Sequence, residues 1–189
     1  MPFRNPFGKR PKSNRAKNDR LFALSTAQVT LDVELGLRNA GVAAVVFKPM
    51  SAGEFARAAS DLEQLLESVA AESGTKIERR NDSFGFEWLI LRDNDLEDLV
   101  TGANLVASEL SDAGFGPQLL AAVFRFSGGE HPVYFVYGFK TASFWPFVPA
   151  GDGQERDNAQ ELELKAKLER ELPIERDLTK WLALYDTPI

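Results

Sequence analysis

The stretch LLAAVFRFSGGEHPVYFVYGFK at residues 119–140 decides the fold. It contains two apolar runs, 119–126 and 133–140, separated by the turn-forming sequence at 127–130. Both runs are rich in β-branched and aromatic side chains, which favour strands. A short connection that contains glycine between two such runs is typical of a hairpin. These residues therefore predict a β-hairpin.

A second hairpin and a helix precede it. Residues 75–80 and 84–91 form two strand-like runs around Asn81, Asp82 and Ser83. The helix that follows is predicted from side-chain acceptors at 93–95 and from an apolar stripe at spacings of three and four, and it ends near Gly114. The stripe consists of Leu96, Leu99, Val100, Ala103, Val106 and Leu110.

The first element is ambiguous. From Val29 to Leu37 every second residue is apolar, which predicts a half-buried strand. Val29, Val33 and Leu37 also fall on one face of a helix, and Ser25 precedes them as a candidate cap. We prefer the strand, followed by a turn at 38–41 and a buried strand at 42–47, which together make a first hairpin.

Three further helices are expected. The first runs over residues 51–73 and the second over about 158–172, capped by Asp157 or Asn158 and ended by Pro173. A short last helix carries the large side chains of residues 178–185. Three hairpins and these helices predict an α+β fold, an antiparallel sheet with amphipathic helices on one face.

The charge distribution separates a tail from this body. The chain has 189 residues and a net charge of −6, but residues 1–20 carry +6 and the other 169 carry −12. We expect a disordered tail at 1–20 and one α+β domain at 21–189. The tail lacks the apolar run of a signal peptide, and it is either a solvated tail or a cationic arm for an anionic membrane surface. Nucleic acid is disfavoured by the acidic body. The candidate lipid-surface residues are Arg4, Lys9, Arg10, Lys12, Arg15, Lys17 and Arg20.

Few residues suit catalysis or metal binding. The chain has no cysteine and one histidine, His131, in a turn before Pro132. It contains no nucleotide-binding, P-loop or EF-hand pattern, so we expect no cofactor, no metal and no catalytic residue. The carboxylates at 93, 95, 97 and 98 are interpreted as helix-capping acids. The alternative is an enzyme that brings them together with Arg156 in one cleft.

The most unusual stretch is FWPF at residues 144–147. Three aromatic side chains around a proline do not suit an ordinary strand or helix interior. They either cover an open end of the core or form an apolar patch for a partner. We take Phe144, Trp145 and Phe147, together with Trp181, as candidate partner-binding residues.

Several short segments, in this order and spacing, resemble the actinobacterial PspA-associated protein PspAB family. The resemblance covers about residues 21–189. The segments are LFAL (21–24), VTL (29–31), FKP (47–49), NDSFGFEW (81–88), DLEDLV (95–100), AGFGPQLL (113–120), FWPF (144–147), RDN (156–158), ELPIE (171–175), DL (177–178) and Trp181.

This resemblance implies a function that the residues alone do not. It implies a non-enzymatic partner of PspA, a coiled-coil membrane-binding protein, in the phage-shock or envelope-stress response. It implies a cytoplasmic location, peripheral to the inner face of the cell membrane. The predicted architecture is also similar to type III secretion chaperone-like and YbjN-like folds, which bind proteins, so a generic protein-binding module is the alternative.

Overall fold

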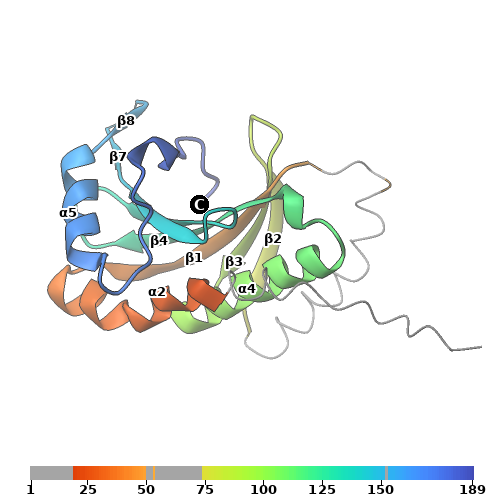
Figure 1. Ribbon diagram of the computed structural model, residues 1–189, viewed down its shortest axis with the longest axis horizontal. Coiled ribbons are helices and arrows are strands. Elements are labelled where there is room, and N and C mark those ends of the chain that lie inside the picture. The colour runs from red at the N-terminus through yellow and green to blue at the C-terminus, as the bar shows by residue number, and fades with distance from the viewer. Residues whose placement is uncertain (1–18, 50–52, 54–73, 152) are drawn as a thin grey trace, which may run out of the picture.

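A six-stranded antiparallel sheet organises the chain, with the order β2-β3-β1-β4-β5-β6 (Figure 1). The computed structural model describes residues 19–49, 53, 74–151 and 153–189. The strands are β1 (Arg38–Phe47), β2 (Lys76–Asn81), β3 (Glu87–Arg92), β4 (Leu119–Ser127), β5 (Val133–Gly138) and β6 (Ser143–Phe147). A two-stranded ribbon, β7 (Pro149–Ala150) and β8 (Glu155–Arg156), follows β6.

The hairpins predicted around residues 81–83 and 127–130 are confirmed as β2–β3 and β4–β5. Helices cover one face of the sheet, as the sequence predicted, and the main core lies between them and the strands. Helix α4 (Leu96–Asp112) buries the whole predicted stripe, and the Asp95 carboxylate caps it by accepting the N–H of Glu97 at 2.8 Å. A short 3-10 turn, η3 (Gly116–Gln118), joins α4 to β4.

The predicted strand at residues 29–37 is wrong. The five-residue π-helix η2 (Thr30–Glu34) lies there instead, and it continues a helical stretch that begins with η1 (Asp19–Phe22) and α2 (Ala23–Thr26). Leu24, Ala27 and Leu31 are fully buried at helical spacing, whereas Val29 and Val33 are 71% and 76% exposed. The expected turn at 38–41 is instead the start of β1, which lies between β3 and β4 and belongs to no hairpin.

The FWPF stretch lies in a strand, contrary to the prediction. Strand β6 is at the edge of the sheet, where proline is tolerated because one side of the strand needs no ladder bond. The N–H and carbonyl of Phe144 point outward, to Pro173 and Glu175. Backbone groups alternate along a strand, so the nitrogen of Pro146 also points outward and no bond to β5 is lost.

The C-terminal elements differ in part from the predictions. Helix α5 (Asn158–Leu168) begins at the predicted cap, because Asp157 accepts the N–H of Gln160 at 2.9 Å. The expected last helix is only a 3-10 turn, η4 (Leu178–Lys180). The helix predicted at 51–73 lies outside the described residues, except for Gly53, which is helical. Within the described ranges, no helix combines the length and apolar character needed to cross a bilayer.

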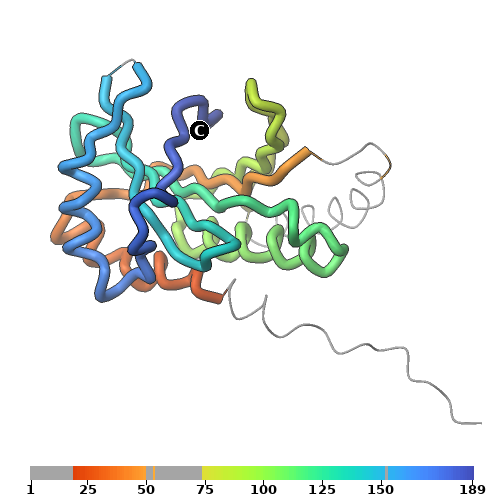
Figure 2. Tube along the Cα trace, turned by 45° about the horizontal axis from the view of Figure 1, so that its top comes forward, coloured from red at the N-terminus to blue at the C-terminus, as the bar shows by residue number. Residues whose placement is uncertain are grey.

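The other face of the sheet is covered by residues 178–189, which we call the C-terminal segment. Figures 1 and 2 both place it on the side of the sheet away from α4. A second apolar cluster lies under it and includes Trp88, Val136, Trp145 and Trp181. Strands β3, β4, β5 and β6 are therefore largely buried on both faces, by helices on one and by extended chain on the other, whereas β2 has no buried residue.

Candidate functional site

The C-terminal segment is attached to the sheet at several points along its length. The indole N–H of Trp145 donates to the carbonyl of Leu182 at 3.0 Å, and the hydroxyl of Ser83 donates to Asp186 at 3.0 Å. The hydroxyl of Tyr134 donates to the main-chain oxygen of Ile189 at 3.0 Å. Burial raises the pKa of Tyr134 above its ordinary 10.0, which keeps this phenol protonated as a donor.

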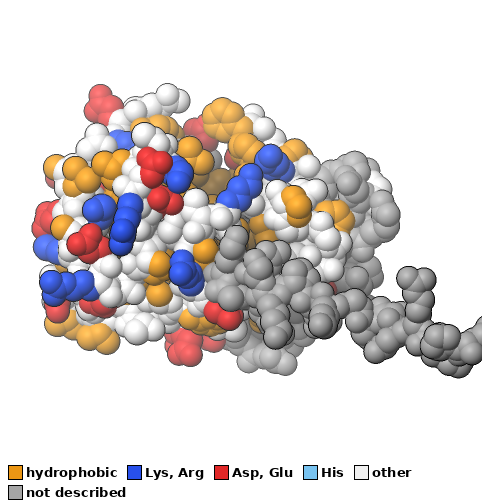
Figure 3. All heavy atoms as spheres, in the orientation of Figure 1, with side chains coloured by type: hydrophobic (Ala, Val, Ile, Leu, Met, Phe, Trp, Pro, Cys, Tyr) orange, Lys and Arg blue, Asp and Glu red, His pale blue; other side chains and the backbone are white. Residues whose placement is uncertain are grey.

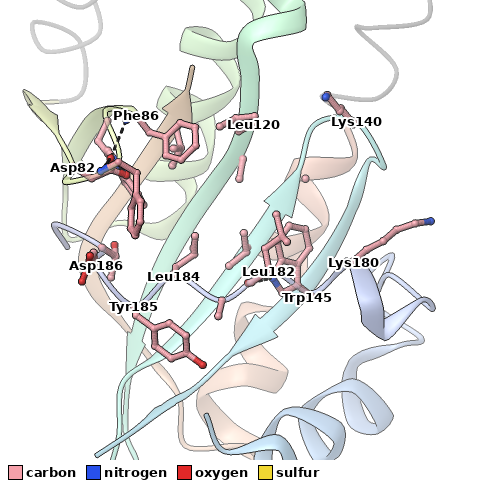
Figure 4. Close-up of a pocket in the computed structure, with 18 of the residues that line it drawn as sticks. Asp82, Phe86, Leu120, Lys140, Trp145, Lys180, Leu182, Leu184, Tyr185 and Asp186 are labelled. Carbon is pink, nitrogen blue, oxygen red and sulfur yellow. Dashed lines mark hydrogen bonds between the residues drawn. The ribbon is translucent and has the colours of Figure 1, made fainter. Parts of the chain in front are cut away.

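An apolar groove of about 720 Å³ lies between this segment and the sheet. We call it the C-terminal groove; its size is that of a specific binding site rather than a packing defect. Strands and the β2–β3 turn supply the floor and one wall, and the C-terminal segment supplies the other wall (Figure 4). The side chains that line it from the sheet and its turns are Val46, Lys48, Asp82, Phe84, Phe86, Trp88, Leu120, Ala121, Val136, Lys140, Thr141 and Trp145, and those from the segment are residues 179, 180 and 182–187.

Large apolar side chains remain exposed on both rims of the groove. Phe84 in the β2–β3 turn is 70% exposed, and Leu182 in the C-terminal segment is 65% exposed. Figure 3 shows that this face is hollowed beside the C-terminal segment, with hydrophobic side chains in and around the hollow. Apolar side chains gathered around a concave site are typical of surfaces that bind apolar partners or ligands.

Charged side chains lie at the ends of the groove. Lys140 and Lys180 are at one end, and Asp82 and Asp186 are at the other (Figure 4). Asp82 accepts the main-chain N–H of Phe84 and the indole N–H of Trp88, both at 2.9 Å. The donors to Asp82 are neutral, so its negative charge is not cancelled by them.

The four aromatic residues predicted to bind a partner lie in different environments. Phe144 belongs to the core on the α4 side, because side chains alternate along β6. Trp145 points to the other face and lines the C-terminal groove, with 5% of its surface exposed. Phe147 is fully buried under the C-terminal segment, and Trp181 is 6% exposed and donates its indole N–H to the carbonyl of Glu175. Of the four, only Trp145 lines the groove.

A short turn fixes the start of the C-terminal segment. Glu175 accepts the N–H of Asp177 at 3.0 Å, and this bond lowers the pKa of Glu175 from its ordinary 4.5. The hydroxyl and N–H of Thr179 hydrogen-bond to Asp177 and lower the pKa of that carboxyl as well. Both carboxylates therefore hold the turn in their ionised form.

A buried ion pair joins this segment to α5. Glu161 is 2% exposed, and its carboxylate accepts Arg156 Nε at 3.0 Å and the main-chain N–H of Val148 at 2.9 Å. Arg156 also donates to the carbonyl of Trp181 at 3.0 Å and lies 5.4 Å from the ring centre of Phe147. Arg156 is thus paired with Glu161.

The other polar candidates do not meet in the groove. The carboxylates at 93–98 lie around the start of α4, where Asp93 accepts the hydroxyl of Thr75 at 2.7 Å and Asp95 caps the helix. Arg156 is paired with Glu161 and does not approach them. His131 is half-buried in the β4–β5 turn. No three or more His, Asp or Glu side chains come together as a metal site in residues 19–49, 74–151 and 153–189.

Most of the basic tail lies outside the described residues. This holds for Arg4, Lys9, Arg10, Lys12, Arg15 and Lys17. Arg20 is described, and its guanidinium donates to the carbonyl of Ala142 at 3.4 Å. It therefore contacts the loop between β5 and β6.

Sequence reasoning missed most of the groove. The sequence places Phe84 in a strand and Lys140 at the end of another, with no indication of a site at either residue. It does indicate that the large side chains of residues 178–185 dock on the body or on a partner, and of these Leu182 and Tyr185 line the groove. The other signal available was the pair of large apolar side chains in segments interrupted by turn residues. Their meeting across the sheet depends on where the C-terminal segment lies, which no local pattern indicates.

One family model matches the chain. It is PspAB, described as PspA associated protein B, and the match covers residues 2–189. The match thus includes almost all of the basic tail at residues 1–20, whereas the resemblance described above covered only about residues 21–189. No curated protein and no solved structure matches the chain.

Proposed function

Since the chain belongs to the PspAB family, PspA associated protein B, we propose that it is a non-enzymatic partner of the coiled-coil protein PspA in the envelope-stress, or phage-shock, response. We choose PspA as the partner because of the family match. In this proposal the C-terminal groove is the binding site, and one α-helix of PspA places its apolar face against Phe84 and Leu182, above a floor that includes Trp145.

The shape and chemistry of the groove support a helix as the occupant. Recognition of a helix in a groove requires a concave apolar surface that receives side chains at positions i, i+3, i+4 and i+7. The floor is apolar, and its rims carry Phe84 and Leu182, 70% and 65% exposed. A small ligand enclosed in the cavity would not contact the exposed apolar side chains on the rims, whereas a helix would contact both rims at once.

The hydrogen bonds of Trp145 suit it to the centre of such a site. Its indole N–H donates to the carbonyl of Leu182, so the ring is held in place, and with 5% of its surface exposed it forms part of a rigid floor. A partner would therefore make its main apolar contacts with Phe84 and Leu182, which are 70% and 65% exposed. Few polar groups converge in the groove, which supports binding rather than catalysis.

The experiment measures binding between purified PspA and this protein by isothermal titration calorimetry at low salt. We expect Phe84→Ala and Leu182→Ala each to weaken binding by about tenfold, because each removes an apolar contact at an interface. Leu162→Ala is the matched control, since Leu162 is 47% exposed on α5 and does not line the groove. Absence of binding by the wild type contradicts the proposed function, and equal binding by all four proteins contradicts the groove.

The same experiment includes anionic vesicles. PspA is expected at a membrane, and the basic residues of the tail favour an anionic surface by about 1 kcal/mol each when close to it. We expect a variant with Lys9, Arg10 and Lys12 changed to Ala to lose vesicle binding while it keeps PspA binding. Unchanged vesicle binding by this variant contradicts a lipid role for the tail.

A further inference from the structure

The C-terminal groove runs across the strands. It begins at the β2–β3 turn with Asp82, passes over β1 and β4, and ends beside β5 and β6 with Lys140. The C-terminal segment follows the same direction, from Lys180 near Trp145 to Asp186 beside Ser83 (Figure 4). A helix in the groove therefore lies across the sheet and passes both ends.

The charges of the groove are separated along this direction. Asp82 and Asp186 lie at the β3 end, and their described hydrogen-bond donors, such as Ser83, are neutral. Lys140 and Lys180 lie at the β5–β6 end, where Lys180 approaches Asp177 to 3.6 Å with both side chains about half exposed. Lys140 has no ion-pair partner within 4 Å among the described residues, and Lys48 lies between the ends, after β1.

From this arrangement we propose that the groove selects a helix with separated charges, acidic where it passes Lys140 and Lys180 and basic where it passes Asp82 and Asp186. The proposal rests on the proposed function, because it specifies the chemistry of the helix that binds. Complementary charges at both ends favour one direction of the helix, since the reversed helix brings like charges together.

The distance between the ends sets the spacing of the charges on the helix. Three strand spacings of about 4.8 Å separate β3 from β5, so the ends are about 14 Å apart. At a rise of 1.5 Å per residue this corresponds to about ten residues of α-helix. The recognised segment of PspA is thus about three turns long, with an apolar face between a basic and an acidic end.

Charge reversal tests the selectivity. We expect Lys140→Glu with Lys180→Glu to weaken PspA binding at low salt by about tenfold or more, and to reduce its salt dependence. Lys165→Glu with Lys167→Glu makes the same change of net charge on α5, outside the groove, and is expected to leave binding within about twofold. Equal binding by the wild type and by both double variants overturns the inference.

Cross-linking tests the direction. A photoreactive residue at position 140 or at position 186 is cross-linked to purified PspA, and the labelled sites are mapped by mass spectrometry. We expect one site beside acidic residues from position 140, and one beside basic residues, about ten residues away, from position 186. Sites in the opposite arrangement, or both directions in equal yield, overturn the proposal.

The outcomes separate the two proposals. If Phe84→Ala and Leu182→Ala weaken binding but the lysine reversals do not, the groove binds PspA without charge selection and only this inference fails. If neither set changes binding, the proposed groove fails first. If the lysine reversals reduce binding to phosphatidylglycerol vesicles and leave PspA binding unchanged, the lysines contact lipid and the inference is overturned.

Discussion

Removal of the buried carboxylate of Glu161 tests how the C-terminal segment is held to the body. This carboxylate forms an ion pair with Arg156, accepting its Nε–H at 3.0 Å, and accepts the main-chain N–H of Val148 at 2.9 Å. Arg156 in turn donates to the carbonyl of Trp181. One substitution, Glu161→Ala, therefore disturbs α5, the exit from β6 and the start of the C-terminal segment together.

The expected cost follows from what is left without a partner. Val148 is fully buried, and an unpaired buried N–H costs about 1–3 kcal/mol. The side chain of Arg156 is 20% exposed, so its charge also loses its partner in a largely dry environment. Breaking a buried ion pair from one side costs about 3–5 kcal/mol in total. At about 2–4 °C per kcal/mol for a chain of this size, the melting temperature is expected to fall by about 6–20 °C.

The assays are thermal denaturation, which gives the melting temperature, and chemical denaturation, which gives the free energy of unfolding, both followed by circular dichroism and tryptophan fluorescence. Glu163→Ala is the matched control, because it removes the same charge from the same helix. Glu163 pairs with Lys167 at 2.6 Å, but the two side chains are 62% and 48% exposed, and such pairs contribute about 0.3–0.5 kcal/mol. If Glu161→Ala costs no more than Glu163→Ala, the interpretation of this ion pair as the link to the C-terminal segment is refuted.

Three further predictions concern the body of the protein. Leu31→Ala is expected to lower the free energy of unfolding by about 2–5 kcal/mol and Val33→Ala by less than about 0.5 kcal/mol, because Leu31 is buried and Val33 is exposed. Chemical denaturation measures both values, and equal losses contradict a helical first element. Gly128→Ala is expected to lower the melting temperature sharply. Gly128 has a φ of +146°, which side-chain-bearing residues rarely adopt, and a Cβ at this position would lie 1.9 Å from the carbonyl oxygen of Gly36. An unchanged melting temperature contradicts this contact. The main-chain N–H of Asp177 lowers the pKa of Glu175 from its ordinary 4.5, so the stability that this carboxylate contributes is complete above about pH 4.5 and is lost as the pH falls through the lowered pKa. We therefore expect the melting temperature of Glu175→Gln to fall less on acidification than that of the wild type. Identical acid profiles for the two proteins contradict this prediction.

Elements with strong local patterns were predictable from the sequence. Helix α4 has an apolar residue at every third or fourth position and an acidic cap, and both features act locally. The hairpins β2–β3 and β4–β5 likewise have apolar runs on either side of short turns. In these elements local preference and tertiary packing favour the same structure, so the pattern alone was sufficient.

The first element shows where such a pattern fails. Residues 29–37 fit period two as well as they fit a helical face, so the choice depends on which residues are buried. Leu24, Ala27 and Leu31 are buried under α4 in the main core, and that packing selects the helix. The deciding residues Leu24 and Ala27 lie before the alternating run, outside the window that predicted the strand.

For the C-terminal groove, the sequence predicts which face of a strand some lining residues occupy, but not the groove itself. Period two places Trp145 and Phe147 on one face of a strand and Phe144 on the other, but it does not say which face is covered by what. The answer depends on residues 182–187, which are about 40 positions away and make few regular hydrogen bonds. A segment of this kind carries no periodic pattern, and its position is set by side chains such as Trp145, Ser83 and Tyr134 that bind its carbonyls and carboxylate. These hydrogen bonds fix the segment over the sheet at residues 182, 186 and 189, and each joins residues far apart in the sequence, so the groove between segment and sheet follows from tertiary contacts that no local pattern contains.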